Sequence, residues 1–342
     1  MGKRISCIFL CVSIVALFLI STEANSQTKD KPVILKAVTP FPKTNMGIVC
    51  CVPLFVEGVN KRAQGRLKID WLGGPEVIAS FDQILSLKSG AIDMLLHYPY
   101  GYLVSLMPEG RAKGLSELCE WEERKSGAFE LWSEIFEKKA NAKYLGRLHS
   151  KAFMYVFSNR KVDKVADFKG LKIRTMPLYT SFIKALGAIP VTTAPTDIYF
   201  SMERGVVDAF LYSKIGSTSW GVQEVTKYII EPGVFQLEAA TMINLDSWKK
   251  IPNDLQEMLM EFIQYHEYIG SMQGQMIEEK EHRVWEKAGA KIVKLPPEEA
   301  EKFIKLAHDS VWEDVIKDAP EYGPKLRRAM SKTAVPKGAF PW

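Results

Sequence analysis

Two stretches of the chain, SLKSGAIDMLL at residues 86–96 and SMERGVVDAFL at residues 201–211, follow one pattern. In each, a helical pattern ends at a glycine suited to a left-handed cap, and a short β-prone run follows. Each stretch therefore predicts a helix that leads directly into a strand of a sheet. Two such units 115 residues apart indicate two lobes built on the same plan, although chance similarity over eleven positions remains the alternative.

Strands and helices alternate around both stretches, which favours parallel α/β sheets. In such sheets ligands bind beyond the carboxyl ends of the strands. Those ends carry Tyr98 and Tyr100 in the first unit and Tyr212 in the second. Tyrosine supplies both an apolar wall and a hydroxyl, which suits a pocket for small organic molecules. We expect strands at 33–38 and 67–71, and helices at 46–59, 80–90, 179–186, 196–205, 254–287, 298–315 and 321–330.

The predicted helix at residues 254–287 would be about 50 Å long at 1.5 Å per residue. That length exceeds what one small lobe needs, so we expect this helix to span both lobes. Its methionines, including Met272 and Met276, recur at helical spacing. We interpret this methionine-rich stripe as part of the core and not as a binding face.

The N-terminus has the layout of a secretory signal peptide. Lys3 and Arg4 precede an apolar run at residues 5–20, and small residues follow as Ala24-Asn25-Ser26. We expect cleavage near Ser26 and a periplasmic mature protein. An uncleaved membrane anchor is the alternative, but the run is shorter than the roughly 20 residues that span a bilayer.

The composition excludes some classes of function. The chain has 45 Lys and Arg against 40 Asp and Glu, scattered along its length, so there is no basic stripe for nucleic acid. Beyond the signal peptide the cysteines are Cys50, Cys51 and Cys119, which form no disulfide framework. We expect small buried thiols, with a bridge from Cys119 to one of the pair still open.

Four segments resemble the solute-binding subunit of TRAP transporters, the DctP family. They are DFKGLKIR at 167–174, ALGAIPV at 185–191, DIY at 197–199 and GVVD at 205–208, and their order and spacing both match. The resemblance covers about residues 33–330. It extends to GGPE at 73–76, GAID at 90–93 and WKKIPND at 248–254.

This resemblance implies a two-lobed periplasmic-binding-protein fold, of class α/β, with crossing strands between the lobes and a long helix spanning both. Lobe I would comprise residues 27–152 plus about 241–282, and lobe II about 153–240 plus 283–330, with 331–342 as a tail. The lobes would close on a small organic acid and deliver it to the small and large membrane permease subunits. We expect a monomer without a cofactor, and no metal, since Ser219-Trp220 lacks an acidic neighbour.

The resemblance places the arginine that grips the ligand carboxylate at Arg174. A guanidinium offers a planar fork of donors that lysine cannot reproduce, although a structural ion pair is the alternative for any single arginine. Sialic-acid-binding members carry a second arginine where this chain has Met154. With tyrosines at 98 and 212, the site is less polar than a sugar-acid site. Phe41, Tyr100 and Trp220 complete the predicted set.

We therefore expect a monocarboxylate with an apolar or aromatic body. A C4-dicarboxylate or a sugar acid with the same transport role is the alternative, as is a binding protein that serves a sensor. An enzyme is disfavoured because HExxH, GxSxG, GxGxxG and the P-loop motif are all missing from the sequence.

Overall fold

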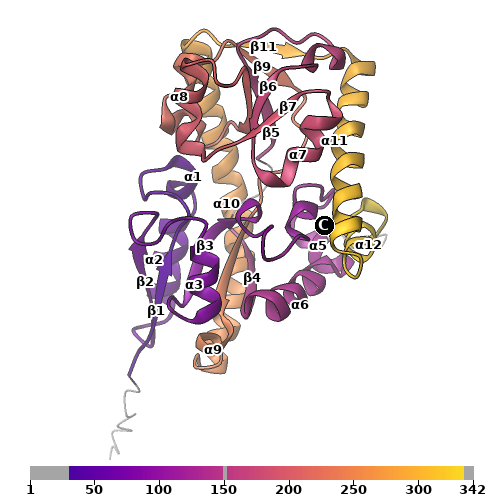
Figure 1. Cartoon of the computed structure of the whole chain (residues 1–342). Coiled ribbons are helices and arrows are strands. Elements are labelled where there is room, and N and C mark those ends of the chain that lie inside the picture. Colours follow the sequence, from indigo (N-terminus) through magenta and orange to yellow (C-terminus); the bar gives the residue numbers. More distant parts are fainter. Residues whose placement is uncertain (1–30, 149–151, 335–342) are drawn as a thin grey trace, which may run out of the picture. The chain divides into compact units, whose positions relative to one another are not determined.

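The chain folds around two mixed β-sheets, seen in the computed structural model that describes residues 31–148 and 152–334 (Figure 1). The strand orders are β2-β1-β3-β10-β4 and β11-β9-β5-β8-β6-β7. The predicted α/β two-lobed class is thereby confirmed. The first sheet comprises β1 (Val33–Val38), β2 (Leu67–Gly73), β3 (Met94–Pro99), β4 (Ala142–Arg147) and β10 (Ala239–Asn244), and the second comprises β5 (Met154–Ser158), β6 (Lys172–Thr175), β7 (Ile189–Thr192), β8 (Ala209–Ser213), β9 (Tyr228–Glu231) and β11 (Lys291–Lys294).

The two sheets share one plan and exchange one strand each. Three consecutive strands start each sheet in the same spatial order, β2-β1-β3 and β7-β6-β8. The next strand in each comes from the other half of the chain: β10 is antiparallel to β3, and β5 is antiparallel to β8. The expectation of wholly parallel sheets is therefore wrong at this one position. A strand that arrives from the other lobe enters from the opposite end, so it runs against its neighbour.

The repeated aspartate explains why the two quoted stretches look alike. The Asp93 carboxylate accepts a hydrogen bond from the backbone N–H of Lys36 in β1, and the Asp208 carboxylate accepts one from Lys172 in β6, both at 2.9 Å. The glycine three residues earlier has a φ of 79° in the first unit and 67° in the second. The left-handed glycine ends the helix, and the aspartate then ties the incoming strand to its neighbour.

The predicted helix at residues 46–59 is two helices, with a break at Cys50 and Cys51. Pro53 lies in the first turn of the second helix, where it has no N–H to donate to the preceding turn. The helices of the described residues are α1 (Met46–Val49), α2 (Val52–Arg62), α3 (Gln83–Ser89), α4 (Gly110–Lys113), α5 (Glu120–Ser126), α6 (Ala128–Ala140), α7 (Thr180–Ala185), α8 (Ile198–Glu203), α9 (Leu245–Trp248), α10 (Asn253–Lys287), α11 (Pro297–Asp318) and α12 (Gly323–Ala329).

Helix α10 braces both lobes, as predicted. It contains 35 residues and runs behind both sheets in the view of Figure 1. It packs on α2, α5 and β4 at one end and contacts the second lobe at the other, where Trp285 stacks on Phe157 with ring centroids 4.7 Å apart. Helix α11 packs against both α7 and α4, and α12 packs against α4 and α6. The residue boundaries predicted for the lobes remain a prediction.

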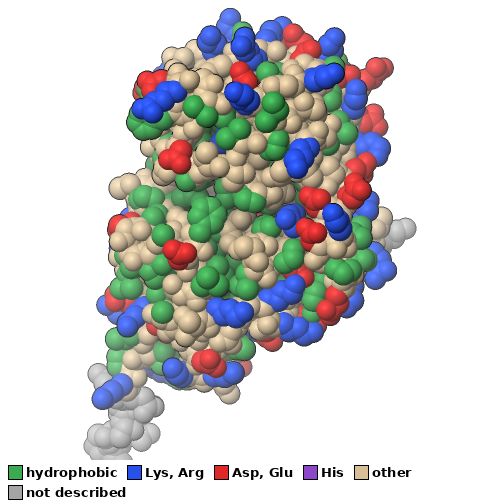
Figure 2. Space-filling view, viewed as in Figure 1, with side chains coloured by type: hydrophobic (Ala, Val, Ile, Leu, Met, Phe, Trp, Pro, Cys, Tyr) green, Lys and Arg blue, Asp and Glu red, His purple; other side chains and the backbone are tan. Residues whose placement is uncertain are grey.

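Two expectations about side chains in the core are wrong. On α10, Met272 and Met276 are 51% and 61% exposed, so the methionine stripe lies largely outside the core, whose helix contacts are made by leucine, isoleucine and phenylalanine. Cys50 and Cys51 are buried, but Cys119 is only partly buried, and all three thiols are free, so the open possibility of a Cys119 bridge is not realised. On the face seen in Figure 2, hydrophobic side chains gather at mid-height.

The predicted signal peptide at residues 1–26 lies outside the described residues, as does most of the predicted tail. Within the ranges 31–148 and 152–334, no helix combines the length and apolar character needed to cross a membrane.

Candidate ligand-binding site

A cavity lies where the carboxyl ends of β1, β3, β6 and β8 meet the first residues of β5 and β10. The antiparallel strands start at the edge where their parallel neighbours end, as the pairing of Ala239 with Pro99 shows. The cavity volume is about 30 Å³, enough for only one or two water molecules. Its lining residues are Phe41, Pro99, Tyr100, Gly101, Tyr102, Gly114, Met154, Met176, Leu178, Tyr179, Pro195, Tyr212, Gln236, Leu237 and Glu238.

Arg174 lies directly behind this lining. Its guanidinium donates twice to the Thr193 carbonyl, from Nε at 3.0 Å and from Nη2 at 2.6 Å, and Nη2 also meets the Met176 sulfur at 3.3 Å. Its Cζ lies 6.0 Å from the centre of the Tyr212 ring. Met176 and Tyr212 both line the cavity. These two side chains therefore lie between the Arg174 guanidinium and the cavity.

The Arg174 charge is buried and incompletely paired. The side chain is inaccessible to solvent, and Nη1 has no hydrogen-bond partner in the part of the chain that the structure describes. Among the described residues, no carboxylate lies within ion-pair distance of its guanidinium. Burial lowers the pKa of Arg174 to about 10, with the Tyr212 and Tyr102 side chains opposing this change. The group stays charged at neutral pH, and a buried charge without a counter-charge is costly to keep.

Aromatic rings from both lobes meet at the cavity. Tyr212 in β8 packs edge-on against Trp220, with ring centroids 5.1 Å apart, and Trp220 packs against Phe41 at 6.1 Å. Phe41 in turn meets Tyr102 at 6.2 Å. Trp220 belongs to the 3-10 turn η5 (Ser217–Trp220). The three rings at 41, 212 and 220 thus join the two lobes through apolar contacts.

The tyrosines at the end of β3 and in the turn η1 (Tyr100–Tyr102) after it have different roles. The Tyr98 hydroxyl donates to the Ser80 carbonyl at 2.7 Å, and its ring packs behind Tyr102 at 5.6 Å. The Tyr100 hydroxyl is buried and has no hydrogen-bond partner among the described residues. Burial raises the pKa of the Tyr102 hydroxyl to about 12. Burial also raises the pKa of Tyr98 and Tyr100, so all three hydroxyls stay protonated at neutral pH.

Of the seven predicted site residues, Phe41, Tyr100, Met154 and Tyr212 line the cavity, Arg174 lies behind it, and Tyr98 and Trp220 pack on lining residues. Tyr102 and Met176 were adjacent to predicted positions and could have been added from the same reasoning. Residues 236–238 had no signal in the sequence. They reach the cavity only because β10 returns beside β3.

No group of three or more His, Cys, Asp or Glu side chains that could hold a metal ion occurs in the described ranges. The one acidic side chain in the lining is Glu238. The arrangement consists of an apolar, aromatic cavity, a buried guanidinium and a few polar groups.

Two sheets that exchange one strand each, with such a cavity at their facing edges, define a two-lobed solute-binding protein. The chain belongs to the DctP family, described as bacterial extracellular solute-binding protein, family 7, whose family model matches residues 117–318. This is a family of solute-binding receptors and not a class of enzymes.

Known proteins agree with this assignment. A solute-binding protein of Albidiferax ferrireducens is 27% identical over 272 residues, which is 76% of this chain and 79% of the relative. A TRAP periplasmic solute-binding protein from Desulfovibrio salexigens, solved with bound orotic acid, matches with a TM-score of 0.78 at 14% identity, covering 88% of this chain and 98% of that one. Another from Rhodoferax ferrireducens, solved with bound malonate, has a TM-score of 0.74 at 24% identity, with coverage of 88% and 98%. At these identities the solved structures support the fold alone.

Proposed function

We propose that this protein captures a small organic carboxylate in the periplasm and delivers it to the membrane permease subunits of a TRAP transporter, with Arg174 forming the salt bridge to the ligand. One observation carries the proposal. Arg174 is a fully buried guanidinium with an unpartnered Nη1 and no carboxylate partner within the described residues. A ligand carboxylate would supply the missing counter-charge and accept hydrogen bonds from two nitrogens at once.

The contact between Nη2 and the Met176 sulfur fits this role. A thioether is a weak acceptor, so a carboxylate can displace Met176 at little cost. The cavity has room for only one or two water molecules. Entry of the ligand therefore requires the two lobes to separate, followed by closure around it.

The lining favours a monocarboxylate with an apolar or aromatic body, such as an aryl or branched 2-oxo or 2-hydroxy acid. No lysine or arginine occurs among the described lining residues, and aromatic rings dominate them. A second carboxylate on the ligand would face Glu238 instead of a cation. Orotic acid and malonate, held by the two structural neighbours, are both carboxylic acids. Of the alternatives in the same transport role, a C4-dicarboxylate would lack a second cation among the lining residues, and a sugar acid would find few polar partners for its hydroxyls.

A thermal-shift screen of carboxylates tests the ligand class. Aryl and branched 2-oxo and 2-hydroxy acids are compared with C4-dicarboxylates and sugar acids. A ligand at 100 times its Kd adds about 2.7 kcal/mol to the free energy of unfolding, and we expect this effect from the first group. Stabilisation by sugar acids alone would contradict the proposed ligand class.

Substitution of Arg174 by lysine tests the proposed salt bridge to the ligand carboxylate. We expect Arg174→Lys to weaken binding of the best carboxylate at least tenfold by calorimetry, because one ammonium cannot match the planar fork. The melting temperature without ligand should stay close to that of the wild type. Arg160→Lys is the matched control. The Arg160 side chain is 70% exposed, and its Nε lies 3.7 Å from Asp208 Oδ1, at the long end of the range for an ion pair. Equal affinity in Arg174→Lys and wild type would refute the assigned role.

A further inference from the structure

Glu238 is the residue just before β10 and lines the cavity. Its side chain is almost completely buried. The backbone carbonyl accepts a hydrogen bond from the Tyr100 N–H at 3.3 Å, which fixes this residue beside the end of β3. The position is therefore set by the sheet and not by a loop.

The two carboxylate oxygens of Glu238 have different surroundings. Oε1 accepts a hydrogen bond from Arg147 Nη1 at 2.7 Å. Oε2 is buried and has no hydrogen-bond partner among the described residues. A buried acceptor without a donor destabilises the folded protein, and such atoms are few in folded proteins. Oε2 can therefore accept a hydrogen bond from a donor group of a molecule in the cavity.

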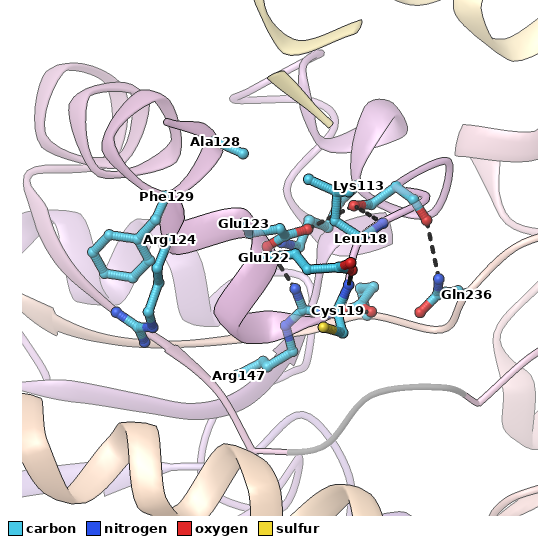
Figure 3. A network of polar contacts seen from close by, with 12 residues as sticks. Lys113, Leu118, Cys119, Glu122, Glu123, Arg124, Ala128, Phe129, Arg147 and Gln236 are labelled. Atoms are coloured by element: carbon cyan, nitrogen blue, oxygen red, sulfur yellow. Dashed lines mark hydrogen bonds and ion pairs between the residues drawn. The ribbon is translucent and has the colours of Figure 1, made fainter. Parts of the chain in front are cut away.

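The neighbouring charges are already satisfied without Glu238. Glu123 pairs with Lys113, accepts from Ser116 Oγ at 2.7 Å and meets Arg147 Nη2 at 2.5 Å. Figure 3 shows Lys113 and Arg147 both reaching towards Glu123. Although burial alone would raise it, the charges of Arg147 and Lys113 lower the pKa of Glu123 to about 2. This carboxylate therefore takes up most of the positive charge in the cluster.

Within the described part of the chain, Glu238 forms an ion pair only with Arg147, which also pairs with Glu123. Burial raises the pKa of Glu238 to about 7, the charges of Arg147 and Lys113 oppose this, and that of Glu123 adds to it. Above neutral pH the group is ionised and Oε2 is a strong hydrogen-bond acceptor. Arg147 holds Oε1, so the side chain cannot turn to satisfy both oxygens within the protein.

We propose that Glu238 Oε2 is a second anchor in the cavity, which accepts a hydrogen bond from an N–H or O–H group of the ligand. The ligand class narrows to carboxylates that also carry such a donor, in contrast to purely hydrocarbon acids. This inference rests on the proposed function, in which Arg174 holds the carboxylate. Together the two groups recognise opposite polarities: Arg174 donates hydrogen bonds to the ligand carboxylate, and Glu238 Oε2 accepts one from the ligand.

The test compares matched pairs of carboxylates that differ in the donor, by calorimetry at pH 8. The pairs are mandelate with phenylacetate, 4-hydroxyphenylacetate with 4-methoxyphenylacetate, and pyroglutamate with cyclopentanecarboxylate. The wild type should bind the donor-bearing member of at least one pair at least tenfold more tightly, as expected for a hydrogen bond to a charged group. This comparison needs no variant, so it stands even if a variant fails to fold.

The variant Glu238→Gln then inverts the chemistry at one atom. Arg147 requires an oxygen at the Oε1 position, so the glutamine amide nitrogen replaces Oε2 and presents a donor to the cavity. In this variant the donor-bearing member should lose at least tenfold in affinity, while its donor-free partner stays within about threefold. A single cooperative melting transition, at a temperature no lower than that of the wild type, would establish that the charge cluster is intact.

The outcomes separate the two proposals. Equal affinities within every pair, or an equal loss for both members in Glu238→Gln, would overturn the second anchor and leave Arg174 untouched. Failure of the wild type to bind any carboxylate, or unchanged affinity in Arg174→Lys, would overturn the proposed function. If the wild type binds no carboxylate, the second anchor is overturned together with the proposed function.

Discussion

At the scale of single residues, Arg174 and Glu238 are both buried, ionisable and incompletely hydrogen bonded. Arg174 leaves Nη1 without a partner and Glu238 leaves Oε2 without one. Buried polar atoms of this kind lower stability in the free protein. At a binding site that cost is recovered when a ligand supplies the partner, so the two atoms mark where a ligand's polar groups should sit.

The raised pKa of Glu238 predicts a change of stability with pH. Its pKa in the folded protein is about 7, against an ordinary value near 4.5. The folded state therefore binds more protons than the unfolded state between these values, and stability falls as pH rises through that window. Glu281, with its pKa raised by burial to about 7, acts in the same direction. His266, with its pKa lowered by burial to about 4, acts in the opposite direction below pH 6.5.

Glu238→Gln isolates the contribution of one group, because Glu281 and His266 are unchanged in it. Relative to the wild type, the variant should gain stability between pH 5 and pH 8, since glutamine does not titrate. Thermal unfolding followed by circular dichroism at both pH values measures this. Parallel melting temperatures for the two proteins across the range would argue against a raised pKa at Glu238.

At the scale of elements, the contact between α10 and the turn η5 connects the long helix to the aromatic rings of Phe41, Tyr212 and Trp220 at the cavity. Glu281 on α10 accepts hydrogen bonds from the backbone N–H of Gly216 at 2.8 Å and of Thr218 at 3.4 Å. Gly216 has a left-handed φ of 80°, which turns these N–H groups towards the helix. Two residues further on, Trp220 reaches Tyr212 and Phe41.

Glu281→Ala should both destabilise the protein and weaken ligand binding. Two backbone N–H groups would lose their acceptor, at a cost of about 1–3 kcal/mol, and the turn that positions Trp220 would loosen. Differential scanning fluorimetry and calorimetry with the best carboxylate measure the two effects. Glu279→Ala, exposed on the same helix, is the control and should change stability by less than about 0.5 kcal/mol. Identical behaviour of the two variants would show that the contact contributes nothing.

At the scale of the whole molecule, the two lobes meet closely at Gly101. A Cβ added there would lie 2.9 Å from Leu178 Cδ2 and 3.3 Å from Met176 Cε. Gly101 lies in the turn η1 (Tyr100–Tyr102) after β3, and Leu178 in the turn η3 (Pro177–Tyr179) after β6. The missing side chain lets one lobe approach the other across the cavity.

Gly101→Val should hold the lobes apart. We expect at least a tenfold loss of affinity for the best carboxylate, with little change in melting temperature, because the lobes can separate without disrupting either core. Small-angle scattering should show the ligand-induced decrease in radius of gyration in the wild type and its absence in Gly101→Val. Gly101→Ala, whose Cβ meets only the flexible ends of side chains, should have a smaller effect. A variant that closes and binds like the wild type would disprove this role.

The sequence alone determined the features that depend on local patterns. The repeated glycine ends a helix, and the repeated aspartate bonds the next strand to its neighbour. Both features depend on a few adjacent residues, so the two-lobed plan could be predicted from Gly90, Asp93, Gly205 and Asp208. Arg174 was predicted as the ligand-binding arginine because the segments around it match the DctP family in order and spacing, and its role remains a proposal. The long helix α10 followed from its uninterrupted apolar spacing, although that spacing did not show that Met272 and Met276 are exposed.

Only the tertiary structure decided which residues surround the cavity. Tyr98 and Tyr100 are two residues apart, yet the Tyr98 hydroxyl bonds to Ser80 whereas the Tyr100 ring packs on Trp132 and Phe136, because the chain turns from strand to 3-10 helix between them. Glu238 joins the site because β10 enters the first sheet from the other lobe, antiparallel to β3, and its first residues arrive where β3 ends. Strand pairing over 140 residues of sequence is set by the packing of whole lobes, and no pattern near Glu238 records it.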